Sequence, residues 1–284
     1  MITFPNAKIN IGLDIIRRRP DGYHDLVTAM VPTDWRDVLE IVPASAPAST
    51  LTVTGRSVDC PPESNLVMKA LRLMQRTYGL DRVGEMDIYL HKVIPDGAGL
   101  GGGSADAAFT LRMVNDIAGL GASQSELARL AASLGADCAF FVYNTPMLCT
   151  GIGDRLSPLP LSLNGLTLAI IKPDSISVNT RQAYSGVTPA VPDVPLPDLL
   201  ALPVSEWQGR VVNAFEASVF PQFPALSAIK TRLLSLGALY ASMSGSGSAI
   251  YALFDSSAHH ADKLSVTISA AFPSCHIHVS PTWQ

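Results

Sequence analysis

Residues 95–106 read PDGAGLGGGSAD and place five glycines within seven positions. Glycine at that density allows backbone dihedral angles that other residues avoid, and it lets a ligand approach the backbone N–H groups closely. The run follows a strand-like segment and precedes a helix-like one, and the first turn of a helix presents unpaired N–H groups and a positive dipole end. These features together predict a site for an anion, most commonly a phosphate group.

A carboxylate stands among small and apolar residues in segment 135–141, which reads GADCAFF. Apolar surroundings either raise the pKa of a carboxyl group or require a nearby cation that keeps it ionised. Asp137 therefore stands out among the carboxylates of the sequence, although an isolated aspartate more often caps a helix or a turn.

Four interpretations of the glycine-rich run can be compared. A P-loop needs a lysine before the hydroxyl residue, but Gly103 precedes Ser104. A dinucleotide fingerprint is matched by Gly97, Gly99 and Gly102, yet no acidic residue follows at the end of a second strand. The H-R-D and D-F-G motifs of protein kinases do not occur. Five glycines that lead into a helix argue against a turn without chemical meaning.

Strands and helices follow one another along the chain without strict alternation. This pattern predicts an α+β fold with mixed or antiparallel sheets. Strands are expected at residues 7–17, 37–42, 50–54, 86–94, 139–142, 148–152, 166–171, 239–243, 249–254 and 275–279. Helices are expected at residues 64–78, 107–118, 125–134, 225–236 and 258–271. The proline-rich segment 188–203 is the weakest candidate for regular structure.

Composition restricts the class of protein. With 284 residues, 48% hydrophobic and 15% charged, the chain suits a well-buried enzyme of two domains or one large one. A net charge of −4 without an extended basic face argues against a nucleic-acid partner. We expect no membrane span, a cytoplasmic location, no metal at the scattered histidines and cysteines, and a monomer or homodimer.

Three segments together resemble the superfamily of galactokinase, homoserine kinase, mevalonate kinase and phosphomevalonate kinase. Residues 99–108, GLGGGSADAA, are similar to its phosphate loop, and residues 241–248, ASMSGSGS, are similar to its third motif. Residues 7–13, AKINIGL, and 19–24, RPDGYH, resemble the opening of those members that act on a cytidine-diphosphate-linked methylerythritol. The order and spacing of these motifs span nearly the whole chain.

This resemblance implies a two-domain fold with the active site in the cleft between the domains. Residues 1–155 would form an ATP-binding domain with the phosphate loop, and residues 156–284 a domain on the substrate side. The implied reaction is ATP-dependent phosphorylation of the 2-hydroxyl of that cytidylated alcohol, in the non-mevalonate route to isoprenoid precursors.

The resemblance also assigns roles near the reacting hydroxyl. Asp137 matches the general base of the family, and Lys8 matches the lysine that keeps this carboxylate ionised and orients the nucleophile. Asn10 lies two residues further along the same strand and therefore faces the same side as Lys8, so we expect it to contact the substrate.

For the cytidine, the family pattern implies that Tyr23 stacks on the base and that His24 donates or accepts a hydrogen bond. Tyr184 matches a second aromatic residue that sandwiches the cytosine, and Thr180 matches a hydroxyl position of the same segment. Base–aromatic stacking contributes about 1–3 kcal/mol, enough to matter for affinity.

The ATP contacts implied by the phosphate loop involve Pro95, Asp96, Gly97, Ala98, Gly99, Leu100, Gly101, Gly102, Gly103, Ser104 and Ala105. Asn65, at the start of an expected helix, either contacts adenine or serves as an ordinary N-cap. Mg²⁺ is expected between the phosphates, with Ser104 as its protein ligand. The family's second serine after the glycines is Ala105 here, which removes one candidate hydroxyl.

Three rival functions stay open at this point. Another small-alcohol kinase of the superfamily is disfavoured by the aromatic pair Tyr23 and His24, which suits a nucleobase. A regulatory nucleotide-binding module is disfavoured by intact Lys8 and Asp137. A dehydrogenase would bind NAD(P)H and show no ATP turnover.

Overall fold

The computed structural model describes residues 1–58 and 60–282, and its contacts divide the chain into two compact units. Unit 1 comprises residues 1–7, 35–96 and 101–145. Unit 2 comprises residues 8–34, 97–100 and the chain from residue 146 onward. Each unit therefore draws on several segments of the sequence. The division of roles between residues 1–155 and 156–284 stays a prediction.

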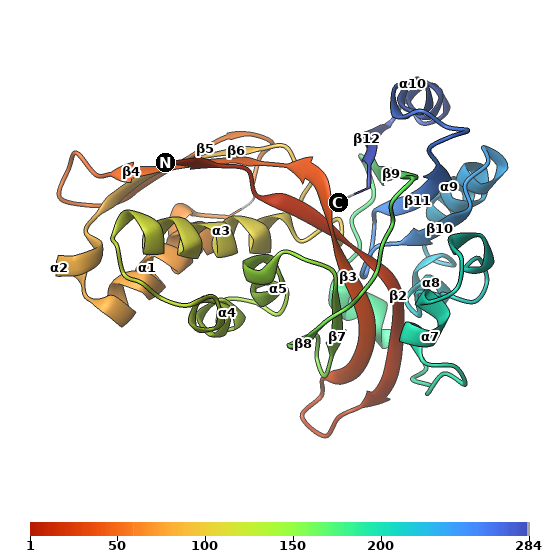
Figure 1. The fold of residues 1–284 in the computed structure, drawn as a ribbon, viewed down its shortest axis with the longest axis horizontal. Helices are drawn as coiled ribbons and strands as arrows, with labels where there is room; N and C mark the ends of the chain where they lie inside the picture. The colour runs from red at the N-terminus through yellow and green to blue at the C-terminus, as the bar shows by residue number, and fades with distance from the viewer. Residues whose placement is uncertain (59, 283–284) are drawn as a thin grey trace. The chain divides into compact units, whose positions relative to one another are not determined.

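Unit 1 contains a mixed sheet in the order β1-β4-β6-β5 (Figure 1). Its strands are β1 (Ile2–Thr3), β4 (Val38–Pro43), β5 (Thr50–Gly55) and β6 (Met86–Lys92). β5 runs parallel to β6, and the other pairs are antiparallel. In β6 the side chains of Ile88 and Leu90 are buried while Tyr89 and His91 are exposed, as the two-residue period of a half-buried strand requires. One face of this sheet is thus covered and the other is solvated.

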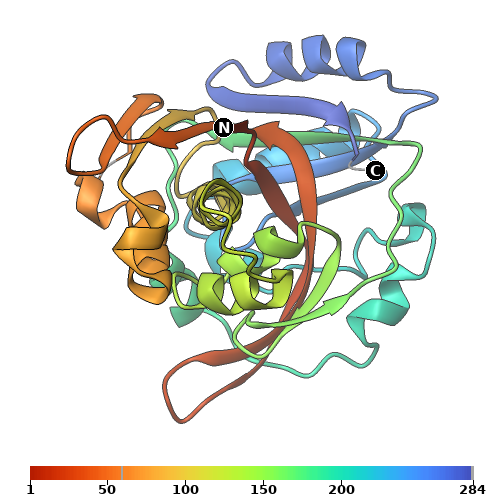
Figure 2. The same ribbon diagram turned by 60° about the vertical axis from the view of Figure 1, so that its left-hand side comes forward.

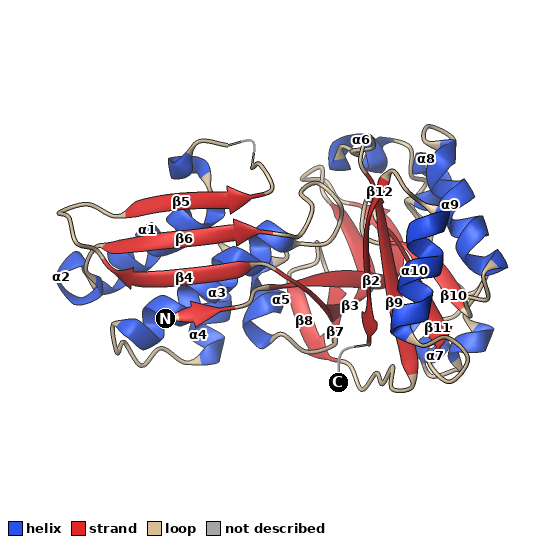
Figure 3. Cartoon of the chain, turned by 90° about the horizontal axis from the view of Figure 1, so that it is seen from above, coloured by secondary structure: helices blue, strands red, loops and turns tan. Residues whose placement is uncertain are grey.

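Helices cover the buried face of that sheet (Figure 3). They are α1 (Leu66–Tyr78), α2 (Leu80–Val83), α3 (Gly102–Ile117), α4 (Gln124–Ala132) and α5 (Cys138–Tyr143), with a short 3-10 helix at Pro62–Ser64. Figure 2 shows α3 almost end-on, and α1, α4 and α5 all pack against it. Ten residues of α3 are buried because small alanines let its neighbours approach. α3 is therefore the central helix of unit 1.

Unit 2 contains two antiparallel sheets. One has the order β2-β3-β7-β8, and the long hairpin β2 (Asn6–Arg18) and β3 (His24–Arg36) dominates it. Its other strands are β7 (Met147–Thr150) and β8 (Arg155–Pro158). The hairpin turns at Gly22, whose φ of +87° is a left-handed conformation that favours glycine.

The second sheet of this unit has the order β10-β11-β9-β12, and α9 and α10 pack on one of its faces (Figure 1). Its strands are β9 (Leu166–Pro173), β10 (Tyr240–Met243), β11 (Ile250–Asp255) and β12 (Cys275–Pro281). The helices are α6 (Thr180–Ser185), α7 (Leu196–Leu200), α8 (Glu216–Val219), α9 (Pro224–Ser235) and α10 (Ala261–Ala271), with a 3-10 helix at Val204–Glu206. A hydrophobic core that includes Phe215, Leu226 and Phe254 fills the space beneath them.

The predicted α+β class with mixed and antiparallel sheets is confirmed. Two local expectations need correction. Residues 139–142, expected as a strand, belong to helix α5, because a short buried apolar run has no periodicity that distinguishes the two structures. Strand β3 was not expected at all, since Pro32 interrupts its pattern.

Candidate active site

The glycine-rich run forms a loop that leads directly into α3. Gly97, Gly99 and Gly101 have φ values of +61°, +75° and +72°, so each uses a conformation that other residues rarely adopt. Gly101 is the N-cap of α3 and contributes no side-chain hydrogen bond. Ser104 lies half-buried in the first turn of this helix. The glycine-rich residues thus lead straight into the first turn of α3, as the sequence predicted, and phosphate binding there stays a prediction.

The first half of the loop, residues 97–100, is held by backbone hydrogen bonds inside unit 2. Leu100 O accepts from Lys8 N at 2.9 Å, and Ala98 O accepts from Ala249 N at 3.0 Å. Gly99 O accepts from Ser244 Oγ at 2.9 Å. A Cβ at Gly99 would lie 2.1 Å from Ser244 O. The three segments that carry the family resemblance therefore meet here.

Lys8 and Asn10 lie side by side on β2, as their spacing predicted. Lys8 Nζ donates to Asn10 Oδ1 at 2.5 Å, and both side chains are buried. Asn10 Nδ2 donates to Thr28 Oγ1 at 3.1 Å on β3, and Thr28 Oγ1 donates to Gly12 O at 2.5 Å. This chain of hydrogen bonds fixes the orientation of the ammonium group.

Asp137 occupies the N-cap position of α5 in unit 1 and is half-buried. Its side chain makes no capping hydrogen bond, so the ordinary role of an aspartate at this position is not the one that it plays here. The pairing of Asp137 with Lys8 stays a prediction.

The neighbouring thiol of Cys138 is fully buried. Burial raises the pKa of Cys138 to about 11, a hydrogen bond with Ser104 opposes this rise, and the charge of Asp137 adds to it. A thiol with such a pKa remains protonated at neutral pH and is a poor nucleophile.

A cavity of about 150 Å³ lies beside the start of α3 in unit 1. Its lining comprises Val58, Cys60, Ser64, Asn65, Leu66, Leu90, Lys92, Asp96, Gly103 and Asp106. Apolar side chains form part of its wall, and polar groups stand at its base. Asn65 is the N-cap of α1 and its Oδ1 accepts from Val67 N at 2.9 Å, so the capping interpretation of this residue is confirmed while adenine contact stays a prediction.

Two of the lining residues, Lys92 and Asp106, belong to a buried ion cluster that was not predicted from the sequence. Lys92 Nζ contacts Asp106 Oδ2 at 2.7 Å and also pairs with Asp37 Oδ2. Asp37 Oδ1 accepts from the backbone N–H groups of Val93 and Ile94. Asp106 Oδ1 is buried without a hydrogen-bond partner in the part of the chain that the structure describes. The Lys92 ammonium group therefore pairs with both the Asp37 and the Asp106 carboxylates.

The charges in this cluster perturb one another. Burial raises the pKa of Asp106 to about 7, although the Lys92 ammonium opposes the rise and Asp37 reinforces it. Burial disfavours the ammonium form of Lys92, but Asp106 and Asp37 outweigh it and raise the pKa of Lys92. The signal for this cluster was present: Lys92 is in phase with buried Ile88 and Leu90 on β6, and a lysine on a buried face needs a partner.

A second cavity, of about 480 Å³, lies beside the hairpin turn in unit 2. It is lined by Arg18, Gly22, His24, Arg181, Tyr184, Ser185, Val187 and Pro189. The rings of His24 and Tyr184 stack with centroids 4.8 Å apart and 20° between planes, and Tyr184 packs edge-on against Phe215. Tyr23 is 61% exposed at the turn. Thr180 Oγ1 lies 3.0 Å from Ser246 Oγ, which brings it against the second glycine-rich loop.

The structure thus groups the predicted residues within each unit. The aromatic residues His24 and Tyr184 meet at one cavity, whereas Lys8, Asn10 and residues 97–100 meet at another place in unit 2. Among the residues described, no group of three or more His, Cys, Asp or Glu side chains could hold a metal ion. No helix in the described residues is long and apolar enough to span a membrane.

Comparison with known proteins places this geometry in a family. Residues 65–145 match the N-terminal domain of GHMP kinases, and residues 200–273 match their C-terminal domain. The 4-diphosphocytidyl-2-C-methyl-D-erythritol kinase of Parabacteroides distasonis is 50% identical over 91% of this chain and 93% of its own. The chain belongs to the 4-diphosphocytidyl-2-C-methyl-D-erythritol kinases, within the GHMP kinases.

Further relatives agree. The corresponding kinase of Bacteroides fragilis is 50% identical over 89% of this chain and 92% of its own. A crystal structure of 4-(cytidine 5'-diphospho)-2C-methyl-D-erythritol kinase has a TM-score of 0.81 at 31% identity, with all of both chains covered. The mevalonate kinase of Methanococcus jannaschii, at 12% identity and a TM-score of 0.74, shares the fold. This GHMP kinase is an ATP-dependent enzyme that phosphorylates a small molecule.

Proposed function

We propose that this kinase transfers the γ-phosphoryl group of ATP to the 2-hydroxyl of 4-diphosphocytidyl-2-C-methyl-D-erythritol, in the non-mevalonate route to isoprenoid precursors. The observation that carries the proposal is the 50% identity to a kinase of that name over 93% of the relative's length. We further propose that it acts in the cytoplasm as a monomer or homodimer, without nucleic acid.

In this proposal Asp137 takes the proton of the substrate hydroxyl, and Lys8 keeps that carboxylate ionised and orients the nucleophile. The absence of a capping bond at Asp137 supports a role other than capping the N-terminus of α5. The hydrogen bond from Lys8 to Asn10 supports a fixed position of the ammonium group. Asn10 contacts the substrate alcohol beside them.

The cytidine occupies the cavity beside the hairpin turn. His24 and Tyr184 already stack there, and a flat base can take the place of one ring on the face of the other. Exposed Tyr23 closes on the base from the turn, and His24 forms its hydrogen bond. Thr180 lies against Ser246 of the second glycine-rich loop. This position suits a contact with the diphosphate of the substrate.

ATP places its phosphates on residues 95–105, where α3 begins, and its adenine in the cavity lined by Asn65. The described residues contain no cluster of metal-binding side chains. That fits Mg²⁺, which is commonly held by substrate phosphates, waters and one or two protein groups. Ser104 would be its protein ligand, and the ion would neutralise charge on the phosphates.

The deciding experiment is a coupled assay of ADP release with the cytidylated alcohol, homoserine and mevalonate offered in parallel. We expect turnover only with the first. Turnover with homoserine or mevalonate alone would overturn the substrate assignment, while ADP release would still identify a kinase.

The role of the base is tested in the same assay with Asp137→Asn. We expect a folded protein with an unchanged melting temperature and a loss of turnover of at least about 100-fold, because general base catalysis contributes roughly 10²–10⁴-fold. A kcat close to that of the wild type would remove Asp137 from the mechanism.

A further inference from the structure

The second glycine-rich loop, residues 244–248, contacts both of the other motifs, so the placement of its backbone matters to them. Ser244 Oγ donates to Gly99 O at 2.9 Å and accepts from Asn10 N at 3.2 Å. A Cβ at Gly245 would lie 3.2 Å from Asn10 Oδ1, the atom that accepts from Lys8. A displacement of this loop would therefore move the acceptor of the Lys8 ammonium and the support of the phosphate loop together.

Asn213 holds this loop from one side. Its side chain is buried, and Nδ2 donates to Met243 O at 2.7 Å and to Gly245 O at 2.8 Å. These are the carbonyl groups on either side of Ser244. Asn213 Oδ1 accepts from Phe215 N at 3.0 Å, which fixes the orientation of the carboxamide.

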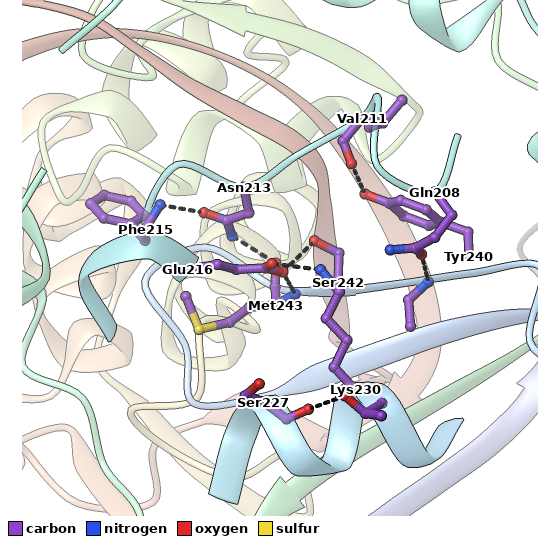
Figure 4. A network of polar contacts seen from close by, with 12 residues as sticks. Gln208, Val211, Asn213, Phe215, Glu216, Ser227, Lys230, Tyr240, Ser242 and Met243 are labelled. Carbon is purple, nitrogen blue, oxygen red and sulfur yellow. Dashed lines mark hydrogen bonds and ion pairs between the residues drawn. The ribbon is translucent and has the colours of Figure 1, made fainter. Parts of the chain in front are cut away.

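Glu216, at the start of α8, holds the strand end that enters the loop. Its Oε1 accepts from Met243 N at 2.9 Å and from Ser242 Oγ at 3.0 Å. Its Oε2 pairs with Lys230 of α9 at 2.5 Å. Figure 4 shows the side chains of Asn213 and Glu216 directed toward the same end of β10.

The short segment that carries these two side chains is itself paired with β2. Leu13 N donates to Val212 O at 2.8 Å, and Ala214 N donates to Leu13 O at 2.8 Å. β2 also carries Lys8 and Asn10. Segment 212–216 therefore links the strand that bears the ammonium group to the loop that supports the phosphate loop.

We propose that Asn213 and Glu216 are positioning residues for phosphoryl transfer. They hold Ser244 and Gly245 where these residues support Gly99 and Asn10. This inference rests on the proposed kinase reaction. Neither residue lines the cavity at Tyr184. We therefore expect their loss to lower turnover more than it weakens binding of the cytidylated substrate.

The first test is Asn213→Ala. We expect kcat to fall about ten-fold or more, since two buried carbonyl groups lose their donors, while KM for the cytidylated alcohol changes less than about three-fold. The matched control is Leu226→Ala, which removes a fully buried side chain from the core of the same unit and lowers the melting temperature. We expect Leu226→Ala to keep its kcat. An equal loss of kcat in both variants, or none in Asn213→Ala, would overturn the proposal.

Glu216 provides a test by conservative replacement. Glu216→Gln keeps an oxygen that can accept from Met243 N and Ser242 Oγ, whereas Glu216→Ala keeps none. We expect kcat within about three-fold of wild type for the glutamine variant and a fall of about ten-fold or more for the alanine variant. Equal losses in the two variants would show that the charge pair with Lys230 matters and that positioning does not.

A measurement independent of catalysis separates this inference from the proposed reaction. Amide hydrogen exchange of peptides covering residues 95–103 and 241–249 reports whether the loops are held. We expect exchange in both peptides to increase clearly more for Asn213→Ala than for Leu226→Ala. If the wild type fails to phosphorylate the cytidylated alcohol, the proposed function falls, yet this exchange pattern still decides the role of Asn213. Unchanged exchange in Asn213→Ala overturns that role.

Discussion

The two halves of the phosphate loop are held by different kinds of interaction. Residues 97–100 are held by neutral hydrogen bonds. Two of these bonds join backbone groups, and one comes from the Ser244 hydroxyl. The half that opens α3 sits over the buried ion cluster, and a Cβ at Gly102 would lie 3.3 Å from Lys92 Nζ. The stability contributed by neutral hydrogen bonds depends on the exact position of donor and acceptor. The stability contributed by a buried ion pair depends on every charge having an opposite charge beside it. The first half should therefore be sensitive to added volume and the second to lost charge.

Lys92→Met should produce the largest effect, because it leaves Asp37 and Asp106 buried together without a cation. We expect the free energy of unfolding to fall by about 3–5 kcal/mol in urea titrations. The control is Lys69→Met on the exposed face of α1, with a change below about 0.5 kcal/mol. Adding Asp106→Asn to Lys92→Met should recover part of the loss, and no recovery would argue against charge as the cause.

Gly99→Ala tests the first half by added volume. The new Cβ would meet Ser244 O at 2.1 Å at a φ of +75°, so the loop must move. We expect kcat to fall about 100-fold, equivalent to roughly 2.7 kcal/mol. Gly121→Ala has a φ of +72° but open space around it, and should leave kcat within about two-fold. Similar kcat values for the two variants would show that the contact with Ser244 is unimportant.

The pH dependence of stability tests the ion cluster again. Burial, partly offset by Lys92, raises the pKa of Asp106 from 3.8 to about 7, so the folded protein binds a proton that the unfolded chain releases between these values. The stability from that proton is complete below pH 3.8 and is lost as the pH rises to about 7. Relative to Asp106→Asn, the wild type should lose up to about 1.4 kcal/mol per pH unit in this window. Parallel pH profiles for the two proteins would contradict the raised pKa.

Substitution of Asn65 should have the smallest effect on stability among these variants. Asn65→Ala removes the N-cap of α1 and should cost about 1 kcal/mol, measured as a lower melting temperature. Asn65→Ser keeps a capping oxygen and should restore the melting temperature. If Asn65 also contacts adenine, KM for ATP should stay raised about three-fold or more in both variants. Full recovery of KM in Asn65→Ser would leave capping as its role.

Much of the fold could be predicted because it follows from local pattern. The strand at residues 86–92 and the helix that ends before Gly79 show clear periodicity and a clear stop. Helix α5 could not be predicted, because its five consecutive buried apolar residues show no periodicity. Strand β3 becomes evident only once the turn at Gly22 folds it back onto β2.

For the candidate site, too, local motifs could be predicted from the sequence and long-range contacts could not. Lys8, Asn10 and the glycine loop could be found because each belongs to a motif whose residues lie within a few positions of one another. The contacts of Asn213 with Met243 and Gly245 join positions about thirty residues apart, and only the folded chain brings them together. The Lys92 cluster joins residues separated by as many as 55 positions. Long-range polar contacts leave no spacing rule in a single sequence.

The order in which the chain is synthesised gives the bond between Ser244 and Gly99 a further consequence. All segments of unit 1 have been made once residue 145 is added, so that unit can fold early. Gly99 must wait for a partner 145 positions further along the chain. A nascent or prematurely terminated chain can thus contain α3 while the first half of its phosphate loop is still unsupported. This part of the loop would gain its support only after the second glycine-rich loop has been synthesised.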